Sequence, residues 1–440
     1  MERPEPAPGV RESQWRDSIE IMRNQLTVAL LLFACALDGE DHKITAVRFA
    51  KLWDGEKVVD GALVVIDRGR IRSVLGGNPQ PPAGAEVVDW SRYYGLPGLI
   101  DVHTHMTYYW DRAPGTLPRG QARMPAVTVF LAQENAKKTL QAGVTSVRDL
   151  GSTDYTDIAM RDLINLGAMT GPRMFVCGYG LSTTRGFRPG AGPVSSPGTA
   201  DSPDEVMQAV RRQIAAGADV IKMYGSIGGF ENVGTQQTFT YEEMKAAVEV
   251  SHTMGKRIAI HSYGPEGARD AVRAGADSLE HAVDIDDATL AEMARRGTYY
   301  VPTIDHNRYY ADAAAEFQFR PGSIQGLNAY IARNLETARR AFKAGVKFAM
   351  GSDAVYTMFG QNTRELAWFV KIGMTPEQAL KTATTNAADL LGAKQDLGWA
   401  TTGHYADLVA VDGDPLADIQ VAIDKVRGVI KGGAVLKLSQ

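Results

Sequence analysis

Cysteine is scarce in this chain: only Cys35 and Cys177 occur among 440 residues. They share no metal-ligand spacing, so the sequence offers neither a disulfide framework nor a thiolate zinc site, and any metal must be held by nitrogen and oxygen. A membrane-length apolar run is missing as well. The N-terminal run from Leu26 to Leu37 is shorter than the roughly 20 residues that a membrane span needs. We therefore expect no stable membrane span.

An excess of basic charge is also missing. Lysine and arginine total 47 against 51 aspartates and glutamates, which gives a net charge of -4. A protein that binds nucleic acid usually carries a basic patch, so we expect no nucleic-acid partner. What is present is ordinary: 44% hydrophobic and 22% charged residues are typical of a globular protein with a sizeable core. This composition favours a small-molecule partner.

The first 43 residues are interpreted as a leader. Arg23 precedes the apolar run, and Ala34-Cys35-Ala36 provides a small-x-small cleavage site, so residues 22–36 have the pattern of a secretory signal. Under this interpretation Met22 is the candidate initiator, and the protein is periplasmic or secreted. The alternative is a buried N-terminal helix, in which case the protein would be cytoplasmic.

After the first 95 residues, short apolar or β-branched runs alternate with amphipathic segments of helix length, which is typical of parallel β/α units. Capping boxes that start at Ser202, Thr240 and Thr375 predict helix starts, and glycines such as Gly217 predict helix ends. Eight strands are predicted, at 98–105, 144–150, 173–178, 220–224, 257–262, 278–282, 299–303 and 347–353. Eight such units predict an α/β fold, a (β/α)8 TIM barrel over residues 96–395.

The segments outside these units also carry strand signals. Residues 44–95 and 396–440 both contain short β-type runs with glycine turns. We expect the two segments to pair as a small composite β-sandwich domain, with two unrelated appendages as the alternative. The longest insertions, at 107–125, 181–201 and 225–239, follow predicted strands, which places them at the catalytic rim of a barrel.

The helix-ending glycines also locate candidate metal ligands, because a strand of similar length follows each of them. Polar residues recur at similar distances after these glycines, and the first strand adds two histidines at spacing i, i+2, which project from one face. The candidates are His103, His105, Lys222, His261, His281 and Asp353. Singly, each could be a structural histidine, a paired lysine or a helix cap. Together they favour a nitrogen and oxygen site that suits zinc, with iron, manganese or cobalt as substitutes.

The ordered motifs resemble those of the amidohydrolase superfamily, and the resemblance covers nearly all of residues 44–438. The motifs are GLPGLIDVHTH (95–105), VRDLG (147–151), IK (221–222), HSYG (261–264), LEH (279–281) and GSD (351–353). Residues 256–301 most resemble the imidazolonepropionase-like branch, which contains zinc-dependent Xaa-Pro dipeptidases, arginine carboxypeptidases and ochratoxin-hydrolysing amidases.

This resemblance implies two zinc ions per chain, with other divalent metals as substitutes, and a homo-oligomer such as an octamer. One ion would be held by His103, His105 and Asp353, the other by His261 and His281, and Lys222 would bridge them as N6-carboxylysine. A metal-bridging hydroxide would then attack the amide carbonyl. Asp353 would act as the catalytic base and acid that passes the proton to the leaving nitrogen.

Other residues that follow strands are candidates for binding the substrate. His306 is a candidate catalytic donor to the substrate carbonyl or its oxyanion, with a surface histidine as the alternative. The candidates for binding a substrate carboxylate are Tyr224, Arg185, Arg188 and Arg308. Aromatic loop residues, among them Tyr109 and Phe187, favour an apolar or aryl acyl group, although an oligomer interface would also use them.

The sequence thus predicts a binuclear zinc amidohydrolase that cleaves the amide bond of N-acyl amino acids or dipeptides, including ochratoxin-type aryl amides. A cyclic-amide hydrolase of the imidazolonepropionase type is the enzymatic alternative. A mononuclear deaminase is disfavoured because it has no use for Lys222. The alternative without catalysis is an inactive amidohydrolase-like scaffold, which we would expect to have lost metal ligands.

Overall fold

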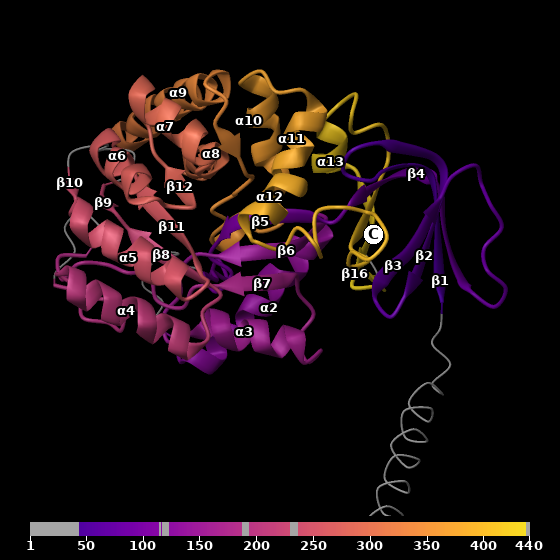
Figure 1. Ribbon diagram of the computed structural model, residues 1–440, viewed down its shortest axis with the longest axis horizontal. Helices are drawn as coiled ribbons and strands as arrows, with labels where there is room; N and C mark the ends of the chain where they lie inside the picture. The colour runs from indigo at the N-terminus through magenta and orange to yellow at the C-terminus, as the bar shows by residue number, and fades with distance from the viewer. Residues whose placement is uncertain (1–43, 114–115, 117–122, 187–192, 229–235, 437–440) are drawn as a thin grey trace, which may run out of the picture. The chain divides into compact units, whose positions relative to one another are not determined.

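The structure, a computed structural model, describes residues 44–113, 116, 123–186, 193–228 and 236–436. The predicted leader and two of the predicted substrate residues, Phe187 and Arg188, lie outside the described residues. Within the described ranges no helix is both long and apolar enough to cross a membrane. Helices and strands alternate along most of the chain (Figure 1).

Eight parallel strands form two sheets. The first sheet has the order β5 (Leu99–Thr104), β6 (Val144–Asp149) and β7 (Arg173–Val176). The second has the order β14 (Lys347–Phe348), β13 (Tyr299–Val301), β12 (Ser278–His281), β11 (Arg257–Ser262) and β8 (Val220–Tyr224). All pairings in both sheets are parallel. Helices cover these strands, which is why strands such as β6 and β8 are continuously buried runs without alternation.

Hydrogen bonds link the two sheets at both of their edges. Beyond β14, the Asp353 amide donates to the His103 carbonyl of β5 over 2.7 Å. Beyond β7, the Leu181 amide donates to the Lys222 carbonyl of β8 over 2.8 Å. The carboxyl ends of the first and the last strand are therefore neighbours.

The last predicted strand is shorter than expected. The sequence predicts strand over 347–353, whereas β14 ends at Phe348. The residues after Phe348 still bond to β5 but are not part of a regular strand, and Asp353 adopts a left-handed φ of 52°. A residue with this backbone cannot continue a strand, so Asp353 turns with the loop.

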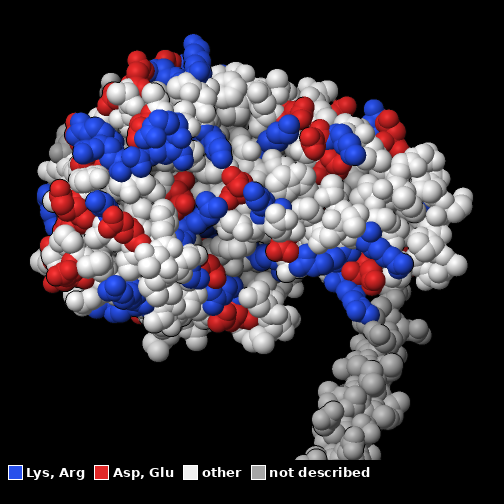
Figure 2. All heavy atoms as spheres, viewed as in Figure 1, with Lys and Arg blue, Asp and Glu red and all other residues white. Residues whose placement is uncertain are grey.

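Helices follow most of the parallel strands. The α-helices in the described part of the chain are α2 (Pro125–Gln141), α3 (Thr156–Asn165), α4 (Pro203–Ala216), α5 (Tyr241–Thr253), α6 (Pro265–Ala274), α7 (Asp287–Arg296), α8 (Ile304–Asp312), α9 (Pro321–Lys343), α10 (Glu365–Lys371), α11 (Pro376–Thr382), α12 (Thr385–Leu390) and α13 (Gln420–Asp424). On the face shown in Figure 2, acidic and basic side chains are interspersed. Some pairs join neighbouring helices, such as Arg340 of α9 with Asp287 of α7 at 2.5 Å.

The predicted helix signals are mostly confirmed. Gly217 ends α4 with a left-handed φ of 107°, and both Thr240 and Thr375 start complete capping boxes. The third predicted capping box, at Ser202, forms only one of its two expected hydrogen bonds. The Ser202 hydroxyl accepts from the Glu205 amide as expected, but the Glu205 carboxylate reaches one residue further back and accepts from the Asp201 amide.

The N- and C-terminal segments form one seven-stranded sheet, in which indigo and yellow strands lie side by side (Figure 1). Its order is β17 (Ala434–Leu436), β16 (Val426–Lys431), β15 (Leu408–Val411), β4 (Glu86–Pro97), β1 (Thr45–Trp53), β2 (Val58–Asp67) and β3 (Arg70–Leu75). The two segments meet where β4 pairs antiparallel with β15, with Leu96 opposite Val409. The sheet also contacts the parallel strands, since Arg173 of β7 donates to Asp407 Oδ2 over 2.6 Å.

Candidate metal centre

The ends of five parallel strands bring the predicted ligands to one place. His103 lies in β5 and His105 just beyond it, and Asp353 follows β14. Their ligand atoms lie within 4.8 Å of one another. From the other sheet, His281 has its ring centroid 4.9 Å from that of His103, and His261 lies 4.7 Å from His281. All of these side chains are buried.

Hydrogen bonds at Nδ1 orient three of the four histidines. His103 Nδ1 lies 2.7 Å from Glu280 Oε2, and His105 Nδ1 lies 3.1 Å from the Gly151 carbonyl oxygen. His281 Nδ1 lies 2.7 Å from Thr303 Oγ1. A histidine that binds a metal typically uses its second ring nitrogen in this way. Three Nε2 atoms are therefore left for a ligand.

Glu280 is a residue to which the sequence analysis gave no role. It lies within the LEH motif and is completely buried, and its Oε1 is 2.9 Å from Arg148 Nη2. Burial alone would raise the pKa of Glu280, but Arg148 and the bond from His103 lower it to about 2. Glu280 is thus a permanent acceptor for His103. The only sequence signal was a carboxylate next to a candidate ligand, His281, in a short predicted strand.

Asp101 was also missed, although it lies in the first motif. Its Oδ1 accepts from the amides of His103 (3.1 Å) and Ser352 (2.9 Å), and its Oδ2 accepts from Asn362 (2.9 Å). Burial raises the pKa of Asp101 to about 6. One buried side chain therefore ties the strand that carries two histidines to the loop that carries Asp353.

Lys222 provides the test of whether a metal fits. Its Nζ is buried and has no hydrogen-bond partner among the residues that the structure describes. Burial lowers the pKa of Lys222 to about 8, because an isolated ammonium in the interior is strongly disfavoured. An amine that is easily neutralised, beside four histidines and a carboxylate, suits a divalent cation held by nitrogen and oxygen. The residues present fit such a metal centre.

The backbone is strained at three neighbouring strand ends. His281, Thr303 and Asp353 have left-handed φ values of 72°, 49° and 52°, and none of them is glycine. Each such residue costs roughly 1–3 kcal/mol, and strain of this kind clusters at functional sites. The conformations turn the chain sharply at the ends of β12, β13 and β14, where the candidate ligands lie.

His306, the predicted catalytic histidine, also reaches this cluster. It lies on α8, and its Nε2 is 3.3 Å from Asp353 Oδ2, while His105 Nε2 is 3.2 Å from Asp353 Oδ1. Burial would raise the pKa of Asp353, but His306, His103 and His105 hold it well below its usual range. Asp353 is therefore a carboxylate with a histidine at each oxygen.

The predicted carboxylate-binding residues lie in different places. The Tyr224 ring is buried, with its centroid 5.7 Å from that of His261. Gly151 makes room for it, since a Cβ at that position would lie 2.7 Å from the Tyr224 hydroxyl oxygen. Arg308 is exposed and pairs with Asp312 on its own helix. The structure thus brings Tyr224, but not Arg308, to the cluster.

Two more predicted substrate residues are bound to surface partners. The exposed Arg185 donates to Gln236 Oε1 over 3.0 Å. The Tyr109 hydroxyl donates to Glu134 over 3.1 Å. Neither interaction involves a candidate metal ligand.

Aromatic rings extend from His105 and His306, the two histidines with the shortest distances to the Asp353 carboxylate. Tyr108 stacks on His105 with centroids 4.8 Å apart, and Tyr310 meets the His306 ring edge to face at 4.7 Å. Phe317, which the sequence analysis did not single out, lies 4.9 Å from Tyr310. The cluster therefore has apolar walls on the sides of His105 and His306.

Comparisons with known proteins agree with this geometry. The profile described as "Amidohydrolase family" matches residues 94–436. The chain is 30% identical to ochratoxinase from Aspergillus niger, over 96% of this chain and 90% of that protein. It is similar to the structure of a Xaa-Pro dipeptidase with bound methionine in the active site, with a TM-score of 0.80, 32% identity and coverage of 90% of this chain and 100% of that one. A prolidase complexed with N-methylphosphonate-L-proline also has a TM-score of 0.80, at 28% identity and the same coverage.

Proposed function

The chain belongs to the amidohydrolase family and is a hydrolase of amide bonds, and on this premise we propose that it uses two zinc ions to hydrolyse N-acyl amino acids or dipeptides. The observation that carries the proposal is the buried Lys222 amine, which lacks a hydrogen-bond partner in the described part of the chain, beside histidines oriented through Nδ1. The names of the ochratoxinase and Xaa-Pro dipeptidase relatives support this substrate class.

The proposed architecture follows from the strand order. We propose that the eight parallel strands close as a (β/α)8 barrel over residues 96–395, because hydrogen bonds link the two sheets at both edges. Residues 44–95 and 396–440 are proposed as the second, composite domain, a β-sandwich in which the one seven-stranded sheet folds over the hydrophobic cluster shared by β1, β2, β15 and β16. The candidate metal centre then lies at the carboxyl ends of the barrel strands, where active sites of such barrels occur.

The proposed ligand set divides into two groups. His103, His105 and Asp353 would hold one ion, His261 and His281 would hold the other, and Lys222 as N6-carboxylysine would offer carbamate oxygens to both. Two divalent cations would supply Lewis acidity, which makes water a stronger acid and polarises the amide carbonyl. Lys222 suits its role because its pKa is already lowered to about 8, so that near neutral pH a neutral amine is accessible, which can add to carbon dioxide and release a proton to give the carbamate.

The remaining steps are assigned to side chains of the chain itself. Asp353 accepts the proton of the attacking water at a carboxylate oxygen and delivers it to the departing nitrogen. His306 Nε2, beside Asp353 Oδ2, donates a hydrogen bond to the oxyanion that develops on the substrate carbonyl. The Tyr224 hydroxyl is the proposed donor to the substrate carboxylate. Tyr108 and Tyr310 provide apolar contact for the acyl group.

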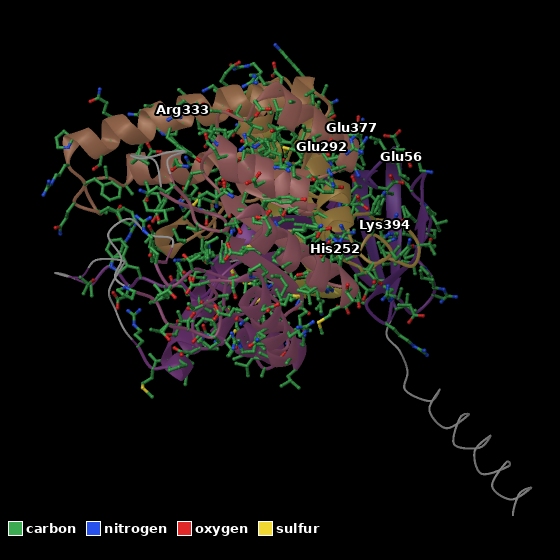
Figure 3. The ribbon with its side chains drawn as sticks, turned by 60° about the vertical axis from the view of Figure 1, so that its left-hand side comes forward. Glu56, His252, Glu292, Arg333, Glu377 and Lys394 are labelled. Atoms are coloured by element: carbon green, nitrogen blue, oxygen red, sulfur yellow. The ribbon has the colours of Figure 1, made fainter. Side chains whose placement is uncertain are left out.

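Metal removal tests the proposal directly. The substrates are a panel of N-acyl amino acids, dipeptides and cyclic amides. Removal of the metal with a chelator should abolish hydrolysis of every substrate that the untreated protein cleaves, and reloading with zinc should restore it. Elemental analysis of the reloaded, active protein should give two ions per chain. His103→Ala should lower both metal content and activity. The matched control is His252→Ala, which removes an exposed histidine of α5 that pairs with Asp277 (Figure 3). Full activity with one ion or none would contradict the binuclear proposal.

A further inference from the structure

The start of α8 is an unusual helix N-terminus. Thr303 occupies the N-cap position, where a threonine hydroxyl normally accepts a hydrogen bond from a backbone amide of the first turn. Thr303 makes no such bond and has a left-handed φ of 49°. Its hydroxyl lies instead 2.7 Å from His281 Nδ1. The side chain that would cap the helix is used to orient a candidate metal ligand.

The missing cap comes from a distant residue, Glu365, at the start of α10. Glu365 Oε1 accepts from the Ile304 amide over 2.9 Å, and Oε2 accepts from the Asp305 amide over 2.8 Å. Glu365 is only 1% exposed. The amide groups of a first helical turn have no partner within their own helix, so in this buried position Glu365 replaces both the threonine cap and water.

Two neighbours of Glu365 hold the side chain of the same helical turn. Trp368 Nε1 donates to Asp305 Oδ1 over 3.0 Å, and Arg364 Nε lies 3.2 Å from Asp305 Oδ2. Both the backbone and the side chain of the residue before His306 are therefore fixed by one short segment of the chain.

The position of this turn determines two contacts of Asp353. His306 Nε2 lies 3.3 Å from Asp353 Oδ2, and His281 Nδ1, held by Thr303, lies 4.0 Å from the same oxygen. We propose that Glu365 is a positioning residue. By capping α8 in place of Thr303, it holds His306 beside Asp353 and leaves the threonine hydroxyl to His281. The kinetic part of this proposal rests on the amide hydrolysis proposed above, whereas its structural part does not.

Glu365→Gln tests the proposal with little change in volume. The amide nitrogen of glutamine would face one of the two backbone N–H groups, so one cap bond is lost. We expect kcat for an N-acyl amino acid to fall about tenfold or more, with a much smaller change in KM, because a displaced catalytic group acts mainly on the transition state. Hydrogen exchange measured by mass spectrometry should become faster over residues 304–312.

Glu243→Ala is the control for a weakened helix N-terminus. Glu243 Oε2 accepts from the Thr240 amide at the start of α5 over 2.7 Å, and alanine removes this bond, whereas glutamine could keep it through its carbonyl oxygen, as Gln378 does for Thr375. Helix α5 carries no candidate metal ligand. This variant should exchange faster at the start of α5 and unfold at a lower temperature, with kcat unchanged.

The outcomes separate positioning from general stability. A folded Glu365→Gln protein with the kcat of the parent, or with unchanged exchange over 304–312, would overturn the proposal. If the Glu365→Gln protein does not fold, Trp368→Phe is tested in its place, because it removes only the hydrogen bond to Asp305. This variant should show a smaller decrease in kcat and a smaller increase in exchange over 304–312. Unchanged kcat and unchanged exchange would again overturn the proposal. If the parent protein cleaves no substrate of the panel, the proposed function fails, and crystal structures of parent and variant still decide whether His306 moves away from Asp353.

Discussion

Lys222 is the residue for which a single substitution has the clearest expected result. Lys222→Ala should lower kcat/KM about 100-fold or more, because no other side chain reproduces a bridging carbamate in length and charge. A short carboxylic acid such as propionate should restore part of the activity by occupying the space of the carbamate. The measurement is steady-state hydrolysis of the best substrate of the panel, with and without the added acid.

Lys347→Ala serves as the control for this experiment. Lys347 is half exposed and pairs with Asp389 at 3.5 Å, so the same substitution removes a lysine side chain at the surface, away from the candidate metal ligands. It should leave hydrolysis unchanged and give no response to the added acid. An unrescued Lys222→Ala enzyme with full activity would rule out the bridging role.

The candidate ligands could be predicted from the sequence, but their supporting residues could not. His103, His281 and Asp353 follow from strand position, because equivalent positions in parallel strands reach the same edge. Glu280 and Asp101 act through partners that lie far away along the chain, and only the fold reveals those partners. The sequence pattern indicates how close a residue lies to the end of its strand, but it does not indicate which distant residue forms a hydrogen bond with it.

Individual elements were predictable where local chemistry decides their ends. The strands β8 and β11 have the predicted bounds, and helix starts at Thr240 and Thr375 follow from capping boxes. The prediction for β14 was too long, since 347–353 looks like one strand while the backbone at Asp353 is left-handed. Strain imposed by tertiary contacts leaves no local signal.

Strand β16 contains a lysine that should make stability depend on alkaline pH. Burial and the charge of Arg173 lower the pKa of Lys431 from 10.5 to about 8. Below pH 8 the lysine is charged in both states, and burying that charge opposes folding. Between pH 8 and 10.5 only the unfolded chain keeps the proton, so the free energy of unfolding should rise with pH.

Lys431→Met should therefore stabilise the protein at pH 7, by about 1 kcal/mol after allowance for partial solvent exposure. The gain should shrink toward zero above pH 10. Urea unfolding at pH 7 and pH 10 measures both values, and Lys51→Met, at an exposed lysine of β1, provides the control. An equal gain at both pH values would contradict the assigned cause.

At the scale of the whole molecule, Asp407 connects the seven-stranded sheet to the parallel strands. Its Oδ2 accepts from Arg173 of β7 over 2.6 Å, its Oδ1 accepts from the Gly432 amide over 2.7 Å, and its carbonyl accepts from the Gly98 amide over 2.8 Å. Three separate parts of the chain thus meet at one largely buried residue. We expect the sheet and the parallel strands to unfold as one cooperative unit.

Asp407→Asn removes the charge beside Arg173 and should lower the free energy of unfolding by about 2 kcal/mol, because a partly buried guanidinium loses its partner. The transition should remain single. Urea unfolding followed by far-UV circular dichroism and by tryptophan fluorescence checks this, since Trp53 and Trp90 lie in the sheet and Trp110 and Trp368 lie in the other part. Two separate midpoints would show that the parts unfold independently.

The pairing of β4 with β15 also fixes the order in which the protein can be completed during synthesis. Pro97 lies opposite Leu408, and all eight parallel strands are encoded between these two residues. While the ribosome makes them, β4 has left it but lacks one neighbour, and an open edge of this kind invites pairing with other chains. The edge of β4 is paired only when β15, one of the last strands to be synthesised, has emerged. A nascent chain that stalls before residue 408 therefore carries an unpaired β4 edge. Release of such a chain would favour aggregation over folding.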